Sequence, residues 1–360
     1  MSAVAGKAAV DAPRGLPRLS RRAIPQLVAL AVILGLDRAV SPGFFHVGLS
    51  RGRLFGSTVD VLNHGAPVAM LSLGMVLVIA TGGIDLSVGA VMAIAGAVAA
   101  SLADSHPLVV SLGAALLVGL VCGVWNGLLV AVLRIQPIVA TLILMVAGRG
   151  VAQLVTGGRI MTFSSHGLGW FGGGSVAGVP AAVVVAAGFV ILTALLVRGT
   201  AVGLMVEATG GNRRASRLAG IDTVTTGIAV YAWSGICAAV AGVLAAADIM
   251  GADANNAGLW LELDAILAVV IGGTSLLGGR FSIGLAVVGA LIIQAMNTGI
   301  LLSGLPAEFN LVVKAAVVMA VLLAQSPRLG TLGARLRGPR GRMEAAGPTA
   351  AGPAAGGIGR

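Results

Sequence analysis

The sequence predicts an all-α fold, a polytopic integral membrane bundle of about ten transmembrane helices. Of its 360 residues, 57% are hydrophobic and only 10% are charged, and the mean hydropathy is +1.01. A soluble domain carries roughly 25% charged residues, which keep it solvated, so most of this chain must face something other than water. Its long apolar runs suit helices of about 20 residues, the length that crosses a bilayer core. Helices are favoured over a closed barrel, the other structure that satisfies every backbone group in lipid, because the runs do not alternate.

Ten apolar runs between polar breaks are the candidate spans. They lie near residues 25–42, 64–80, 87–103, 108–133, 138–156, 180–197, 225–247, 263–278, 282–303 and 308–326. The second and third are short enough to be broken or tilted. We therefore expect a basic N-terminal segment at 1–24 and a transmembrane domain at 25–326. The Gly, Pro and Ala repeats of the tail at 327–360 predict disorder.

Lys and Arg predict the orientation of these spans, because cytoplasmic loops hold the excess of both residues. With the N-terminus inside, 17 of the 23 fall in the inner segments, and only Arg38, Arg51, Arg53 and Arg159 fall outside. The asymmetry predicts that both termini lie in the cytoplasm. It also accounts for the net charge of +10. We do not expect nucleic-acid binding, since the basic residues are scattered and lack interleaved aromatic residues.

Four polar stretches interrupt the apolar runs, and the first is Thr-Gly-Gly-Ile-Asp-Leu-Ser at residues 81–87. Adjacent glycines free the backbone from helical dihedral angles. Irregular backbone at membrane depth is tolerated only where protein covers it or where it lines a water-filled cavity. The stretch therefore predicts a hinge or pathway segment, or else a tight turn with a capping carboxylate. Its candidate residues are Gly82, Gly83, Asp85 and Ser87.

The second stretch, residues 207–221, lies in the longest inner loop and is rich in arginine. Residues 213–219 have the pattern of a short amphipathic helix that Gly220 would end. A short helix on the cytoplasmic face suits the docking of a soluble protein. A basic loop without a partner is the alternative.

The third stretch, residues 252–264, lies outside and contains Asn255, Asn256 and Trp260. Amides and an indole suit sugar hydroxyls or a docking protein, and they suit a solvated loop equally well. Asp264 begins an apolar run, where an ionisable residue is a candidate functional group or an interfacial helix cap.

The fourth stretch, residues 272–280, begins with Gly272 and Gly273 and repeats the Gly-Gly-x-x-Leu-x-x-Gly pattern of the first. The repetition hints at the internal repeats that are common in transporters. Two amides inside apolar runs, Asn126 and Asn297, complete the candidate pathway residues. Arg149 and Lys314 are the charges placed deepest in the spans, and we expect each to pair with a carboxylate or to extend to an interface.

Motifs for chemistry on the chain itself are missing. The sequence contains no G-x-x-x-x-G-K-[ST] phosphate loop and no H-E-x-x-H pair. The four histidines do not have the spacing of metal ligands. We expect no catalytic residues, no metal and no cofactor here, and transport remains as the class of function.

At these same stretches the chain resembles the ribose/xylose/arabinose-type permeases of ABC importers. The likeness lies in residues 74–96 (GMVLVIATGGIDLSVGAVMAIAG), in residues 207–212 with 219–221, and in residues 262–279 (ELDAILAVVIGGTSLLGG). It covers roughly residues 25–326. Within the family the chain is most similar to the permeases of galactofuranose importers, on residues 135–154, 247–260 and 297–304. The second glycine at Gly211 and the long tail depart from the pattern.

The resemblance implies the permease subunit of an importer in the bacterial inner membrane, which moves galactofuranose or a related pentose or hexose by alternating access. It implies a second permease subunit, a cytoplasmic ATPase that binds ATP and magnesium, and a periplasmic sugar-binding protein. Residues for coupling to the ATPase would be Glu207, Ala208, Gly210, Asn212 and Gly220. Two alternatives stay open: a proton- or ion-coupled sugar transporter with Asp85 and Asp264 as its relay, and an ABC permease for nucleosides or branched-chain amino acids.

Overall fold

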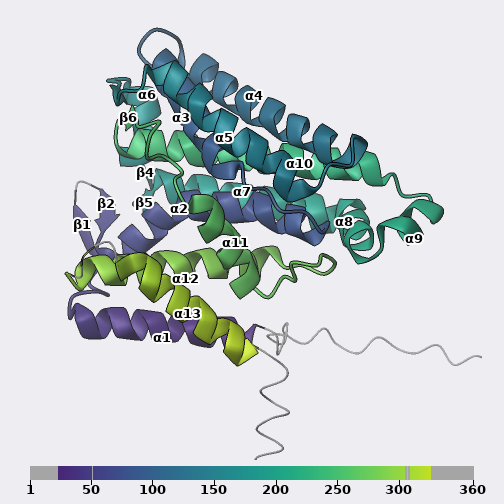
Figure 1. Ribbon diagram of the computed structural model, residues 1–360. Coiled ribbons are helices and arrows are strands. Elements are labelled where there is room, and N and C mark those ends of the chain that lie inside the picture. The colour runs from purple at the N-terminus through teal and green to yellow at the C-terminus, as the bar shows by residue number, and fades with distance from the viewer. Residues whose placement is uncertain (1–22, 51, 305, 307–308, 326–360) are drawn as a thin grey trace, which may run out of the picture.

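The computed structural model describes residues 23–50, 52–304, 306 and 309–325, and these residues are mainly helical (Figure 1). The predicted all-α class is confirmed. The helices are α1 (Ile24–Val40), α2 (Ser57–Ala80), α3 (Val88–Leu102), α4 (Leu108–Gly127) with a following π-helical turn η1 (Leu128–Val132), α5 (Pro137–Thr156), α6 (His166–Gly173), α7 (Ala181–Gly199), α8 (Val202–Gly211), α9 (Arg213–Leu218), α10 (Thr223–Asp248), α11 (Leu261–Ile271), α12 (Ile283–Leu302) and α13 (Phe309–Gln325). Most of the N-terminal segment and all of the tail predicted at 327–360 lie outside the described residues.

In the part of the chain that the structure describes, three pairs of short antiparallel strands gather at one end of the bundle, and α8 and α9 lie at the other (Figure 1). The pairs are β1 (Gly48–Ser50) with β2 (Arg53–Phe55), β3 (Met161–Thr162) with β6 (Gly251–Ala252), and β4 (Ser175–Val176) with β5 (Val179–Pro180). β3 and β6 come from loops far apart in the sequence, so this pairing joins the loop after α5 to the loop after α10.

Among the described residues, six helices are long and apolar enough to cross a membrane: α2, α4 with η1, α5, α7, α10 and α12. The other four predicted spans coincide with shorter helices, α1, α3, α11 and α13. Two predicted boundaries were wrong. α2 begins at Ser57 rather than near 64, and α11 ends at Ile271 rather than near 278 because Gly273 takes a positive φ. Length and composition therefore support a polytopic bundle. They do not confirm the predicted count of about ten spans, because four of these spans are shorter helices.

The core of the bundle is α2, which packs against α10 and α12, and α10, which also packs against α3 and α4. In an 18-residue apolar stretch of α2, 83% of the residues are buried, and in α10 the share is 67%. In the corresponding stretches of α4, α5 and α7, only 22% of the residues are buried. These outer helices expose large apolar side chains such as Val109, Val146 and Leu195. Such surfaces suit lipid, which offers apolar side chains an environment like a protein core.

Glycines let the central helices touch through their backbones. A Cβ atom on Gly119 of α4 would collide with the carbonyl of Gly235 on α10, and one on Gly242 would collide with the carbonyl of Met92 on α3. Close backbone approach gains dispersion where lipid provides little hydrophobic drive. This packing holds α3, α4 and α10 as one block around the breaks described next.

Candidate functional site

The first predicted break, between α2 and α3, is a glycine-ended helix followed by a buried turn. The amide of Gly82 donates to the carbonyl of Ile79 and that of Gly83 donates to Val78. This is the Schellman pattern, and Gly82 supplies the positive φ of 79° that it needs. A Cβ atom on Gly83 would press on the Tyr231 hydroxyl. Both glycines are therefore required by this geometry.

Asp85 lies inside the bundle, with 1% of its surface exposed, and accepts hydrogen bonds from its own loop and from α10. Its Oδ1 accepts from the backbone amide of Ser87 at 3.0 Å and from the Ser87 hydroxyl at 2.6 Å. Its Oδ2 accepts from the Ser234 hydroxyl on α10 at 3.0 Å. Asn126 of α4 donates to the Ser87 hydroxyl at 2.8 Å. The Asp85 cluster, defined as Asp85, Ser87, Asn126 and Ser234, thus joins the break to α4 and α10.

Hydroxyl, amide and backbone donors satisfy Asp85; among the described residues, no cation forms an ion pair with it. Buried carboxylates need such donors, since an isolated one costs several kcal/mol in a low-dielectric interior. Thr141 on α5 adds a further tie, because its hydroxyl accepts from the Leu86 amide at 3.1 Å. Sequence reasoning missed Ser234 and Thr141. Their only signal was a polar side chain inside an apolar run.

The fourth stretch ends α11 in the same way that the first ends α2. The Gly273 amide donates to Val270, the Thr274 amide donates to Val269, and Gly273 has a φ of 84°. The spacing of the bonds is identical in the two breaks. The glycine with positive φ is the first of its pair at Gly82 and the second at Gly273, so the two terminators are offset by one position within the shared Gly-Gly-x-x-Leu-x-x-Gly pattern.

The two breaks and the predicted coupling segment meet at one point, which we call the glycine junction: Ala80, Gly210 and Gly279. The Gly279 amide donates to the Ala80 carbonyl at 2.9 Å. A Cβ atom on Gly210 would collide with that same carbonyl and crowd the Gly279 amide. A movement of α8 would thus act directly on the end of α2 and on the loop after α11.

Within the predicted coupling segment, the expected short helix is confirmed as α9, and Gly220 with a φ of 86° follows it. The Asn212 side chain caps α9 by accepting from the Ala215 amide at 3.0 Å. Glu207 and Ala208 were expected in a loop, and this was wrong. They lie in α8, where Glu207 lines a small groove with Arg198 and Ser282.

The charges predicted deep in the spans have different partners. Lys314 of α13 donates to both oxygens of Asp264 on α11, at 2.7 and 2.9 Å. Arg149 of α5 donates instead from Nη1 to the carbonyls of Ala254 and Ala257. Carbonyls at the end of a loop present negative partial charge, so they satisfy the guanidinium in place of an acid.

Asn297, the last of the candidate pathway residues, belongs to α12. Its Oδ1 atom is buried, and no hydrogen bond reaches that atom from any residue that the structure describes. The structure therefore brings Asp85, Ser87 and Asn126 together in one cluster, whereas Asn297 and Asp264 lie apart from it on other helices.

Of the predicted docking residues, two form hydrogen bonds that shape their loop and one has an exposed aromatic ring. Asn255 accepts from Gln153 of α5 at 2.9 Å, and Asn256 donates to Asp253 at 2.7 Å. Trp260, with a φ of 66°, leaves 55% of its surface exposed. The amides therefore shape the loop before α11, and the indole is available to a partner.

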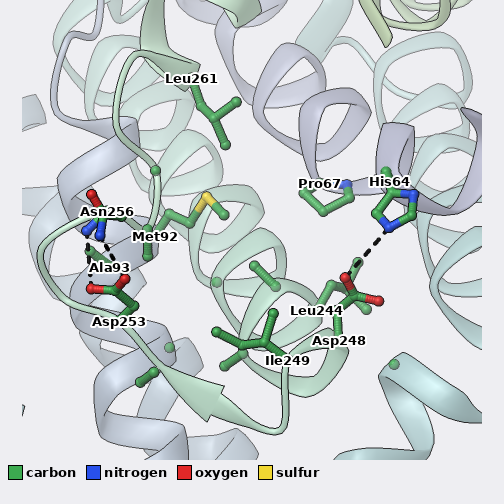
Figure 2. A pocket seen from close by; sticks show the side chains of 18 of the residues that line it. His64, Pro67, Met92, Ala93, Leu244, Asp248, Ile249, Asp253, Asn256 and Leu261 are labelled. Atoms are coloured by element: carbon green, nitrogen blue, oxygen red, sulfur yellow. Dashed lines mark hydrogen bonds and ion pairs between the residues drawn. The ribbon is translucent and has the colours of Figure 1, made fainter. Parts of the chain in front are cut away.

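A cavity of about 360 Å³ lies beside this loop, between α2, α3 and the end of α10 (Figure 2). Figure 2 shows His64 pointing toward Asp248 on one side, with Nε2 3.7 Å from Oδ2, and Asp253 beside Asn256 on another. Small residues of α3 and α10 form much of its wall. Neither His64 nor Asp248 is among the candidate residues predicted from the sequence.

A bundle of apolar helices, with glycine-ended breaks that protein covers and a cavity at one end, is the architecture of a polytopic membrane permease. A family model described as the permease component of branched-chain amino acid transport systems matches residues 57–322. The chain belongs to this family of ABC import permeases, as the sequence resemblance predicted.

Three relatives show how the likeness is distributed. The galactofuranose transporter permease protein YtfT of Escherichia coli (strain K12) is 60% identical over 320 residues, which cover 89% of this chain and 93% of the relative. The fructose import permease protein FruF of Bifidobacterium longum (strain NCC 2705) is 45% identical, covering 80% and 83%. The ribose import permease protein RbsC of Escherichia coli (strain K12) is 38% identical, covering 84% and 93%. No solved structure matches the chain.

Proposed function

We propose that this chain is the membrane permease subunit of an ATP-driven monosaccharide importer, and that its substrate is galactofuranose or a related pentose or hexose. The observation that carries the proposal is the 60% identity to a galactofuranose transporter permease along 89% of this chain. The fructose and ribose import permeases among the relatives support the wider class of monosaccharides.

The mechanism we propose is alternating access driven through the glycine junction. A cytoplasmic ATPase docks on α8 and α9, where Glu207, Ala208, Gly210, Asn212 and Gly220 shape the surface. Closure of the ATPase on MgATP moves α8, and Gly210 transmits the movement to the Ala80 carbonyl and the Gly279 amide. The Schellman-ended breaks at Gly82 and Gly273 are the hinges. This chain itself binds no ATP in the proposal.

Further partners complete the proposed importer. A second permease subunit pairs with this one, and a periplasmic sugar-binding protein docks at the end that carries the strands and the exposed Trp260. The complex lies in the inner membrane with both termini of this chain in the cytoplasm. Support for this orientation comes from the arginines of α9, which lie at the end opposite the strands (Figure 1).

The test is to purify the membrane complex through a tag on this subunit and to measure sugar uptake in proteoliposomes. We expect an ATPase to co-purify and uptake of D-galactose, D-fructose or D-ribose to require ATP on the side of the membrane that carries the ATPase. A panel of branched-chain amino acids and nucleosides tests the other ABC substrates. If the subunit came out alone and moved sugar without ATP, the proposal would be overturned.

The proton-coupled alternative is tested on the two carboxylates it needs. Asp264 already holds Lys314, and Asp85 already accepts from Ser87 and Ser234. With Asp85→Asn and Asp264→Asn in separate transporters, ATP-dependent uptake by either variant in the absence of a proton gradient argues against a relay. Uptake that follows the proton gradient and ignores ATP would favour one.

A further inference from the structure

We infer that the cavity between α2, α3 and the end of α10 is a monosaccharide-binding site of this permease subunit. The inference rests on the proposed function and adds to it a place where the sugar binds. The polar residues that line the cavity are Asn63, His64, Asp248, Asp253, Asn256 and Gln294.

The size and wall of the cavity suit a sugar. Its volume of about 360 Å³ lies in the range of roughly 300–1,000 Å³ typical of small-molecule sites, which combine a mainly apolar lining with a few placed polar groups. Ala93, Gly96 and Ala97 of α3 and Gly242 and Ala246 of α10 supply the apolar wall. Such small side chains can face the C–H surface of a sugar ring while leaving it room.

Asn63 is the polar group that most clearly lacks a partner. Its side chain lines the cavity, it is 7% exposed, and its Oδ1 is buried without a hydrogen bond among the described residues. Because a buried polar atom without a partner costs about 1–3 kcal/mol, a native protein rarely leaves one without reason. The oxygen is enclosed in this conformation, so the Asn63 amide must turn toward the cavity before a sugar hydroxyl can donate to it.

His64 and Asp248 offer acceptors at the side of the cavity shown in Figure 2. The Nδ1 atom of His64 lies 3.0 Å from the Asp60 carbonyl, which only accepts, so Nδ1 carries a proton. In a neutral ring Nε2 is then an acceptor, and it faces Asp248 Oδ2 at 3.7 Å. Each of these two acceptors can take one proton from a sugar, so neighbouring hydroxyl groups can donate one to Nε2 and one to Oδ2.

Asp253 and Asn256 face the cavity from the loop before α11. Donation from the Asn256 amide at 2.7 Å, followed by donation from the backbone amides of Asn255 and Asn256, lowers the pKa of Asp253 below its ordinary value. The carboxylate is ionised at neutral pH and fixes the orientation of Asn256. This pair gives the site a second polar edge, opposite His64 in Figure 2.

The cavity is closed on the side that leads toward α8 and α9. The backbones of Gly96 and Gly242 touch, so no passage remains between α3 and α10 at that level. Further along α2, Leu73, Met75 and Ile79 are completely buried. A sugar in the cavity would therefore be held at the strand-bearing end until the helices rearrange, as alternating access requires.

The experiment places a cysteine in the wall and asks whether the sugar protects it. Ala257→Cys is made in a chain whose native cysteines are replaced, Cys122→Ala and Cys237→Ala, within the complete reconstituted transporter. Ala257 lines the cavity and is half-buried. The probe is whichever of D-galactose, D-fructose and D-ribose the transporter takes up. We expect modification by a thiol reagent to slow about tenfold when the sugar is at ten times its half-protecting concentration.

A matched control and a second variant make the result specific. Leu49→Cys lies at the same end on β1, is 69% exposed and lies outside the cavity, so sugar should not protect it. Asn63→Leu combined with Ala257→Cys should raise the half-protecting concentration about fivefold, the loss of one hydrogen bond, and Asn63→Asp should restore part of it. An unchanged rate of labelling without sugar, with the ATPase still bound, shows that the Asn63 variant is folded.

The outcomes separate the two proposals. If the unsubstituted transporter takes up none of the sugars, both the proposed function and the cavity site fail. If uptake is normal but the sugar protects the thiol introduced by Ala257→Cys no more than the one introduced by Leu49→Cys, the cavity site alone is overturned. Equal protection in Ala257→Cys with and without Asn63→Leu would remove Asn63 from the site.

Discussion

The ammonium of Lys314 and the carboxylate of Asp264 form a buried ion pair, with side chains 11% and 6% exposed. Removing water from two charges is costly, and their attraction compensates only while both are present. The pair therefore links α11 to α13, and removing either partner alone should destabilise the protein.

Asp264→Asn should destabilise the protein by about 3–5 kcal/mol, because it leaves a buried ammonium without its carboxylate. Unfolding in detergent, followed by heat or denaturant, measures the loss. The double variant Asp264→Asn with Lys314→Met should recover much of it, since no unpaired charge remains. A double variant as unstable as Asp264→Asn alone would show that the pair is not the cause.

The Asp85 cluster can be tested at its longest-range contact. Ser234→Ala removes the donor to Asp85 Oδ2 and should cost about 1–3 kcal/mol, the cost of leaving a buried polar group without its partner. Ser111→Ala is the matched control. That hydroxyl is equally buried but has no partner in the described residues, so its removal should be nearly neutral. Equal losses in the two variants would contradict the assignment.

At the scale of elements, the contact of α4 with α10 depends on glycine. Gly119→Ala would push a methyl group into the Gly235 carbonyl, and overpacking of this kind costs about 1–3 kcal/mol. Gly113→Ala on the same helix meets nothing within 4 Å and should leave unfolding unchanged or slightly delayed. Comparing the thermal stability of the two variants checks the prediction, and equal stability would overturn it.

At the contact between α8 and α2, two adjacent glycines also differ in whether a methyl group would fit. Gly210→Ala collides with the Ala80 carbonyl, whereas Gly211→Ala meets nothing within 4 Å. We expect Gly210→Ala to lose most ATP-dependent uptake and the sugar-stimulated part of ATP hydrolysis. Gly211→Ala should keep both, since a helix tolerates alanine better than glycine. Full activity in Gly210→Ala would remove the glycine junction from the coupling route.

At the scale of the whole molecule, the orientation in the membrane is open to direct test. In a chain without native cysteines, Leu49→Cys should react with an impermeant thiol reagent added to the periplasmic side. Arg214→Cys, on the exposed face of α9, should react only after the membrane is opened. The reverse pattern would place both described ends of the bundle the other way round and would contradict the orientation predicted from Lys and Arg.

Local sequence pattern was sufficient to predict the class of the protein, the positions of most helices and the places where they break. Apolar length predicts spans wherever the residues lie in the bundle. The glycine pairs at Gly82 and Gly273 predict helix ends because a positive φ is a local requirement that glycine meets without strain. The short helix before Gly220 was found for the same local reason, and it is confirmed as α9.

Which of these parts meet depends on how the helices pack, and local pattern carries no information about such contacts. Asp85 accepts from Ser234, 149 residues further along the chain. Asp264 and Arg149 were both candidates for pairing, yet α13 supplies Lys314 to the first and a loop supplies carbonyls to the second.

The glycine junction and the cavity beside Asn63 have the same origin. Ala80, Gly210 and Gly279 come from three separate segments, and the wall of the cavity comes from α2, α3 and the region around the end of α10. Both features exist only once helices distant in sequence lie against one another, because a contact between backbones and a space between helices are properties of their relative placement.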